Sequence, residues 1–329
     1  MTAKSGLRPQ RIDIQALRGL AIILVLMHHA RISFVPGGFL GVDIFFVISG
    51  YLMAGIIDEA LNNGSFSFAA FYARRVRRLL PAAYATLLVT AALAPLLLDA
   101  SEYRYFVTQL AGSFGFFVNF VLWQQTDYFG SGAELKPLLH MWSLSVEEQF
   151  YIFLPMGMLL ATRRFRLAAI TALVLASAAL CVHVLRISPS ATFYLLPTRA
   201  WELGLGSMTA LLVRRGVLQS RPLPALRIAC AATLVVVPLL ADAGGHPGLP
   251  AALCCLATAL LLVPGAQVGS GKLLAPIAWT GDRSYSLYLV HWPVYSLVNN
   301  VYIDAVPQYL NLALLLVCLL WTEVQYRYV

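Results

Sequence analysis

The sequence predicts an all-α fold, a polytopic membrane helix bundle of about ten transmembrane helices that forms a single domain over residues 1–329. Of the residues, 60% are hydrophobic and only 12% are charged, and the mean hydropathy is +0.75. Soluble domains carry about 25% charged residues. Apolar runs of about 20 residues, the length that crosses roughly 30 Å of hydrocarbon, recur along the chain. Because period-2 alternation is absent, the spans are expected to be helices rather than barrel strands.

Ten candidate spans follow one another along the chain. They cover residues 14–34, 40–57, 79–98, 142–161, 167–185, 198–213, 226–241, 248–264, 284–301 and 309–325. Short basic clusters lie between them, and the positive-inside rule places such clusters in the cytoplasm. The clusters are Lys4/Arg8/Arg11, Arg74–Arg78, Arg163/Arg164/Arg166, Arg214/Arg215/Arg221 and Lys272. Both termini are therefore expected in the cytoplasm.

The segment 104–123 is predicted to be re-entrant or interfacial. If it crossed the membrane fully, every later basic cluster would lie outside the cell. Its polar residues Gln109 and Asn119 stand among small and aromatic residues, a composition that lipid tolerates only where other helices cover it. With this topology, residues 140–148 lie at the outer face.

Two other classes of protein are disfavoured. The net charge of +8 could suggest nucleic-acid binding, but the basic residues form short clusters between apolar spans. The five cysteines all lie in apolar runs without zinc-ligand spacing, and the histidines match no haem or metal motif. No metal is therefore expected, and no P-loop or dinucleotide-binding glycine motif is present.

The first predicted helix carries buried ionisable residues. Arg18 and His29 are eleven residues apart, almost three whole turns, so they share one face and lie about 16 Å apart along the axis. Ionisable groups inside a span usually line a site or a pathway. The alternative is that Arg18 snorkels to the inner interface and His29 makes one interhelical hydrogen bond.

Asp43 follows a short Pro-Gly-Gly loop and enters the second span at its outer end. At that depth its carboxylate could orient or charge the imidazole of His29. The alternative is a helix N-cap favoured by the helix dipole.

Several motifs resemble the acyltransferase 3 family of membrane O-acyltransferases. The stretch Arg11–Ile57 is similar to the family's opening, in which a basic residue, ten intervening residues and a histidine form a signature matched by Arg18 and His29. The family's R-x-x-R pair is matched by Arg75 and Arg78, just before Pro81. The further matches are LLHMWSLSVEEQFYIFLP, RAWELGLGSM and SYSLYLVHWPV.

The resemblance implies transfer of an acyl group, usually acetyl, from cytoplasmic acetyl-CoA or another acyl-CoA to a sugar hydroxyl at the outer face of the bacterial inner membrane. The implied acceptors are the O-antigen of lipopolysaccharide, peptidoglycan or exopolysaccharide. The wording WSLSVEEQFY resembles the branch that often carries an SGNH esterase-like domain, so the chain is expected to be the membrane portion of a longer protein. The alternative function is a permease for an acyl donor or glycan precursor, although no internal repeat is evident.

The donor and the chemistry are assigned to residues of these motifs. Arg75 and Arg78, with Arg74 beside them, suit the phosphates of CoA, and Arg18 could reach the same donor. The alternative is that these arginines only anchor the topology. His29 is the expected general base for the sugar hydroxyl, or a transient carrier of the acyl group.

The remaining candidates belong to the later motifs. Glu147 is expected at the outer face, where it would contact the acceptor, support His29 or respond to the helix dipole. His140, Trp142 and His291 are the predicted substrate-binding residues, with solvation, an aromatic belt or simple packing as alternatives. The remaining expectations concern contacts between side chains: an intrahelical pair of Arg199 and Glu202, and interhelical hydrogen bonds from the hydroxyls of Ser284, Tyr285, Ser286 and Tyr288.

Overall fold

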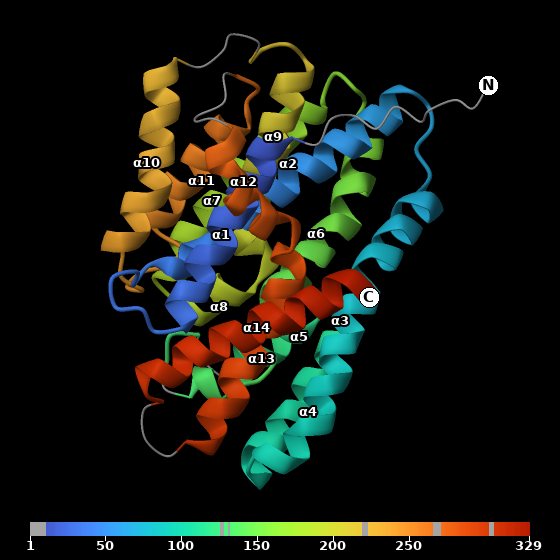
Figure 1. Ribbon diagram of the computed structural model, residues 1–329. Coiled ribbons are helices and arrows are strands. Elements are labelled where there is room, and N and C mark those ends of the chain that lie inside the picture. The colour runs from blue at the N-terminus through green and yellow to red at the C-terminus, as the bar shows by residue number, and fades with distance from the viewer. Residues whose placement is uncertain (1–10, 126–127, 131, 219–222, 266–270, 303–305) are drawn as a thin grey trace, which may run out of the picture.

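All regular elements of the described residues are helices (Figure 1). The computed structural model describes residues 11–125, 128–130, 132–218, 223–265, 271–302 and 306–329, without the side chains of 271–273. The longer helices are α1 (Ile12–His29), α2 (Gly41–Asn62), α3 (Phe68–Leu97), α4 (Ala100–Phe114), α6 (Met141–Leu160), α7 (Arg166–Leu185), α9 (Leu196–Arg214), α10 (Pro224–Leu240), α11 (Leu249–Leu262), α12 (Gly271–Asp282), α13 (Ser284–Val301) and α14 (Gln308–Tyr328). Shorter elements are α5 (Val118–Gln125), α8 (Pro189–Tyr194), η1 (Gly38–Leu40) and η2 (Ala133–Leu135).

Each of the ten predicted spans coincides with a helix. The largest difference is at the third span, which begins as early as Phe68; the first span ends five residues early, at His29, and the second five residues late, at Asn62. Five helices in the described part are long and apolar enough to cross a membrane, namely α1, α2 with the preceding η1, α3, α7 and α14. The all-helical class is therefore confirmed, while the number of about ten transmembrane helices stays a prediction.

Helix α2 lies at the centre of the bundle, against α1, α9 and α6 (Figure 1). Two glycines allow the close approach of α2 and α9. A side chain at Gly50 would collide with the backbone carbonyl of Leu203, and one at Gly206 would collide with that of Val47. Small residues at such crossings let two backbones meet in an apolar environment. This contact fixes the face that α2 presents to the other helices.

Helix α12 packs along α1 and was not predicted from the sequence. Its backbone meets α1 at Gly19, where a side chain would strike the carbonyl of Ile277, and at Gly281, where it would strike that of Gln15. The helix is only 12 residues long and contains Pro276. A pattern that short does not reach the length of a membrane span.

Two of the basic clusters, at the start of α7 and at the end of α9, lie at one end of the bundle. Arg166 at the start of α7 and Arg214 at the end of α9 both bind Asp58 near the end of α2, at 3.1 Å each. Arg215 donates to the carbonyl of Arg163. The positive-inside prediction requires such a grouping. That this end of the bundle faces the cytoplasm stays a prediction. Lys4, Arg8, Arg221 and the side chain of Lys272 lie outside the described residues.

The segment 104–123 forms two short helices rather than one span. Helix α4 ends at Phe114, and α5 begins at Val118 after a turn in which Phe116 has a positive φ of 54°. At about 1.5 Å per residue, the eight residues of α5 rise only about 12 Å and cannot cross the hydrocarbon. Helix α5 packs against α4, α6 and α8. Other helices cover the polar Gln109 and Asn119, which are fully buried, while Phe117 and Phe120 are exposed, so the re-entrant or interfacial position stays a prediction.

Candidate functional site

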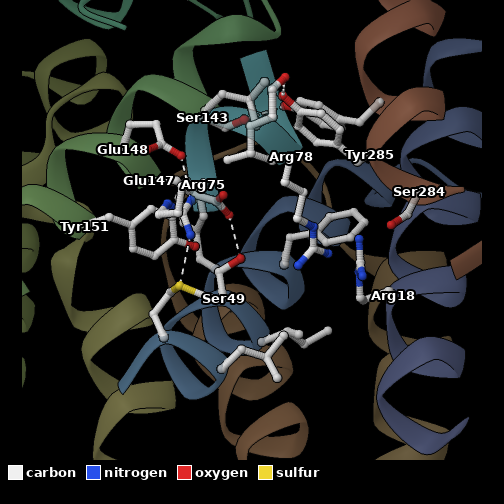
Figure 2. A pocket seen from close by; sticks show the side chains of 18 of the residues that line it. Arg18, Ser49, Arg75, Arg78, Ser143, Glu147, Glu148, Tyr151, Ser284 and Tyr285 are labelled. Atoms are coloured by element: carbon white, nitrogen blue, oxygen red, sulfur yellow. Dashed lines mark hydrogen bonds and ion pairs between the residues drawn. The ribbon is translucent and has the colours of Figure 1, made fainter. Parts of the chain in front are cut away.

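A cavity of about 380 Å³ opens between α1, α2, α3, α6 and α13 (Figure 2). Its charged lining consists of four arginines and two glutamates: Arg18, Arg74, Arg75, Arg78, Glu147 and Glu148. All four arginines predicted to bind the acyl donor therefore lie around one space. The excess of positive charge makes the cavity suitable for an anionic ligand.

The cavity is long because it follows α2. Its lining on this helix extends from Val42, near the helix start, to Ile56, in the last two turns. At 1.5 Å per residue this corresponds to about 21 Å, a large part of the roughly 30 Å hydrocarbon thickness. Between these limits the α2 lining is mostly apolar, with Phe45, Ile48 and Leu52. A ligand with a charged end and a long, slender arm would match this shape.

Arg75 is held in place by its neighbours. One terminal nitrogen donates to Glu148 Oε1 at 2.6 Å, and the guanidinium lies 3.7 Å from the centre of the Tyr151 ring. Among the ion pairs of the described residues, no carboxylate binds Arg74 or Arg78. Arg75 is thus a fixed cation in the cavity wall, while its two neighbours on α3 have charge available for a ligand.

Glu147 lies deeper in the protein than predicted. Its carboxylate accepts a hydrogen bond from Ser49 Oγ at 2.8 Å, and both residues line the cavity together with Arg18 (Figure 2). Helix α6 begins at Met141, so Glu147 stands beyond the first turn. The dipole effect is confined to that turn. The alternative in which Glu147 responds to the helix dipole is therefore wrong, while its position near the outer face stays a prediction.

A second cluster of polar rings, which contains His29, lies beside Tyr288 of this lining. Nδ1 of His29 is 3.0 Å from Nε2 of His291 on α13, and the His29 ring meets the edge of Trp292 with centroids 4.5 Å apart. The His140 ring lies 5.9 Å from that of His291. His29 therefore faces the protein interior, on the side of α13, but it does not line the cavity.

Tyr288 connects the two parts of the site. Its ring borders the cavity and lies 5.4 Å from the His291 ring and 5.7 Å from the His140 ring. The hydroxyl shares a hydrogen bond with Ser143 Oγ at 2.6 Å and donates to the His140 carbonyl at 3.0 Å. The predicted interhelical role of this hydroxyl is confirmed. The tyrosine ring is the layer between the cavity and the histidines.

Asp43 does not bind His29, so the predicted contact is wrong. The Asp43 carboxylate instead accepts a hydrogen bond from Arg199 at 3.2 Å, and Arg199 also pairs with Glu202 at 3.1 Å. All three side chains are fully buried. The predicted Arg199–Glu202 pair is present, and it recruits Asp43 because a second carboxylate completes the binding of the buried guanidinium.

The same cluster brings together groups that resemble a metal site. Ligand atoms of Asp43, Glu202 and Cys255 lie within 4.8 Å of one another. Arg199 already bonds both carboxylates and supplies the cation there. His246, in the loop before α11, lies 3.2 Å from Arg199. Burial, reinforced by the positive charge of Arg199, lowers the pKa of His246 well below its ordinary value.

The three predicted substrate-binding residues are all buried. Trp142 is 1% exposed and packs against Phe193 with centroids 4.3 Å apart. His140 is 3% exposed at the start of α6, and His291 is fully buried. Direct contact with a sugar would require the surrounding helices or Tyr288 to move, so the predicted substrate contacts stay a prediction. Trp142 belongs to the aromatic core around Arg199.

Sequence reasoning missed several residues that shape the cavity. Ser49 and Ser143 carry no signal of their own, because single serines are common in membrane helices. Tyr151 and Glu148 acquire their role only through Arg75, which lies more than 70 positions earlier in the chain. The spacing of Glu148 and Tyr151 on one face of α6 was the available signal.

The fold and this site define a polytopic membrane protein with a cationic cavity inside its helix bundle, next to a buried pair of histidines. The chain belongs to the acyltransferase 3 family, since the sequence model of that family, described as an acyltransferase domain, matches residues 11–322. No solved structure matches the chain.

Three curated relatives are similar over most of the chain. "Putative peptidoglycan O-acetyltransferase YrhL" of Bacillus subtilis is 33% identical, over 96% of this chain and 54% of that protein. "Putative membrane-bound transacylase BcsY" of Komagataeibacter xylinus is 34% identical, over 86% of this chain and 72% of that protein. "O-acetyltransferase OatA" of Staphylococcus aureus is 28% identical, over 96% and 56%. The chain thus spans about half the length of YrhL and OatA.

Proposed function

We propose that this protein is a membrane O-acyltransferase that moves an acetyl group from cytoplasmic acetyl-CoA to a hydroxyl of a cell-surface glycan at the outer face. One observation carries the proposal: a single long cavity has the predicted arginines on its walls and reaches the tyrosine that packs on His291. Membership of the acyltransferase 3 family supports the reaction class.

The charged end of the donor would bind at the arginines. Arg74 and Arg78 lie on successive turns of α3 and line the cavity, and Arg18 on α1 points toward Arg78 (Figure 2). Phosphate oxygens accept charge-assisted hydrogen bonds from guanidinium groups. Arg75, already bound to Glu148, would keep the cavity wall rigid while the other arginines close on the ligand.

The acyl arm of the donor would follow the apolar lining along α2. Glu147 faces this space from α6 and could accept a hydrogen bond from an amide of the arm, with Ser49 fixing its carboxylate. The thioester would then lie near Ser143 and Tyr288, one aromatic layer from the histidines. Transfer requires that layer to open when donor and acceptor are both bound.

The chemical step needs a base for the acceptor hydroxyl. The sugar O–H gives its proton to His29, the oxygen forms a bond to the thioester carbonyl carbon, and the carbon–sulfur bond breaks. The proton on His29 then passes to the leaving thiolate, which departs as CoA thiol. If His29 carries the acetyl group instead, its Nε2 first bonds to the carbonyl carbon as the carbon–sulfur bond breaks. The sugar oxygen then bonds to that carbon as the nitrogen–carbon bond breaks, and the proton of the hydroxyl passes to the CoA thiolate.

The acceptor is proposed from the relatives. The name of YrhL specifies peptidoglycan O-acetylation, and that relative matches nearly the whole of this chain. We therefore propose peptidoglycan as the first acceptor to test, with exopolysaccharide and O-antigen as the other members of a panel. An SGNH-type domain is a proposed partner in this branch of the family.

Transfer of label tests the function directly. The protein, reconstituted in liposomes, is given acetyl-labelled acetyl-CoA on one side and glycan on the other. Label on the glycan supports the proposal, and label that stays on CoA while crossing the membrane indicates a permease. His29→Ala should lower transfer at least about 100-fold, whereas His183→Ala, at an exposed position of α7, should leave it unchanged. Full transfer by His29→Ala at normal protein levels would contradict the role of His29.

A further inference from the structure

The hydrogen bonds around His291 decide which nitrogen of His29 carries a proton. Nδ1 of His291 lies 2.8 Å from the carbonyl oxygen of Tyr288 and 3.1 Å from that of Leu287. A carbonyl oxygen only accepts hydrogen bonds. Nδ1 of His291 must therefore carry the hydrogen, and a neutral imidazole has only one.

The consequence passes to the next ring. With its hydrogen on Nδ1, His291 presents a lone pair at Nε2, and this atom lies 3.0 Å from Nδ1 of His29. The two rings are only 23° from parallel with centroids 5.1 Å apart, an arrangement that suits an in-plane N–H···N bond rather than face-to-face stacking. Nδ1 of His29 must then donate. The remaining nitrogen of His29, Nε2, holds a lone pair.

We propose that His291 is a positioning residue that holds His29 in its Nδ1–H tautomer and so directs a basic Nε2 toward the acceptor hydroxyl. The inference rests on the proposed function of His29 as the base. The sequence predicted His291 as a substrate contact and Asp43 as the group that orients His29. Here His291 takes the orienting role instead of Asp43. An orienting group behind a catalytic histidine is a general requirement of such bases.

The neutral character of the partner suits its surroundings. His291 is fully buried, and its ring faces His29 on α1, His140 at the start of α6 and Tyr288 on its own helix. A carboxylate at this position would need desolvation without a cation nearby. When Nε2 of His29 takes up the proton of the hydroxyl, the N–H···N bond to His291 becomes charge-assisted and strengthens. His291 thus stabilises the protonated form of His29 at the stage of the reaction in which that form is produced.

Two substitutions separate positioning from packing. His291→Gln keeps an acceptor oxygen near the place of Nε2, and His291→Leu fills similar space without an acceptor. A lost base contribution corresponds to about 10²–10⁴-fold in kcat, so we expect His291→Leu to lose at least about 100-fold with little change in KM for acetyl-CoA. We expect His291→Gln to stay within about 10-fold of the wild type. Cys318→Ala, which removes a buried side chain packed against the His291 carbonyl, is the packing control.

The double variant and the spectrum complete the test. If the two histidines act as a unit, His291→Leu added to His29→Ala lowers residual transfer no further. In the holoprotein labelled with ¹⁵N-histidine, the signals lost in His29→Ala should show a protonated Nδ1 and an unprotonated Nε2.

Each outcome bears on one of the two claims. Three results would overturn the inference while wild-type transfer stands. They are equal losses of kcat in His291→Gln and His291→Leu, a further loss of transfer in the double variant, or a protonated Nε2 on His29. No transfer by the wild type to any acceptor would instead remove the proposed function, and the tautomer would still be read from the spectrum.

Discussion

Replacing Arg199 with methionine removes the cation that bonds two buried carboxylates. Asp43 and Glu202 are fully buried and lie 3.2 and 3.1 Å from the guanidinium. Removing one partner of a buried ion pair costs about 3–5 kcal/mol, because the other charge is left uncompensated. The three side chains come from the starts of α2 and α9, so the loss would loosen the contact between these helices as well.

Thermal unfolding in detergent measures this loss. At about 2 °C per kcal/mol for a chain of this size, the midpoint should fall by roughly 6–10 °C. Arg327→Met is the matched control, since Arg327 donates to Glu323 at 2.7 Å but is 64% exposed. Surface ion pairs contribute little, so the control should leave the midpoint unchanged.

A compensated variant sharpens the test. Asp43→Asn and Glu202→Gln together with Arg199→Met remove all three charges and keep similar volumes, so much of the lost stability should return. The reasoning is refuted if Arg199→Met lowers the midpoint no more than Arg327→Met, or if the triple variant is less stable than the single one.

Three further predictions concern the donor cavity and the loop before α11. Arg78→Ala should raise KM for acetyl-CoA about 10-fold, the equivalent of about 1.4 kcal/mol of lost phosphate binding. The control is Arg77→Ala, because Arg77 is exposed and lies outside the cavity lining, and it should leave KM unchanged. Equal KM values for the two variants would argue against a donor site here. Tyr288→Ala should increase acetyl-CoA hydrolysis without acceptor, measured as released thiol, because the layer over the cavity is removed; unchanged thiol release would count against a separating role. Since burial lowers the pKa of His246, its contribution to stability is complete above pH 6.5 and declines as the pH falls below that value. The wild-type melting midpoint should therefore drop on mild acidification more than that of His246→Phe, and parallel curves would refute the assignment.

The sequence predicted the helices well because hydropathy is a local property. Every predicted span has a helix within a few residues of its limits, apart from the early start of α3 at Phe68. Helix α12 escaped prediction because it is short and interrupted by Pro276, so no 18-residue apolar window marks it. The arginines of the cavity were also predictable, because Arg74, Arg75 and Arg78 lie close together on one short stretch of helix.

The partners of the buried charges could not be predicted in the same way. His29 finds His291 across 262 positions, and Asp43 finds Arg199 across 156. Such pairs depend on how helices cross, and the crossing of α2 and α9 is set by contacts at Gly50 and Gly206 rather than by any charged motif. The sequence predicts Asp43 and His29 at similar depths, but α2 directs the Asp43 carboxylate toward Arg199 on α9.

The separation of the cavity from His29 follows from what the proposed reaction must avoid. An acetyl thioester beside a basic imidazole would lose its acetyl group to water whenever water entered. In this structure the arginines and the histidine pair belong to different compartments, and Tyr288 packs between them with its hydroxyl bonded to Ser143 and the His140 carbonyl. Donor binding alone would therefore leave the base shielded. Acceptor binding near His29 would have to displace the ring before the carbonyl carbon and the base can meet, which couples transfer to the presence of both substrates.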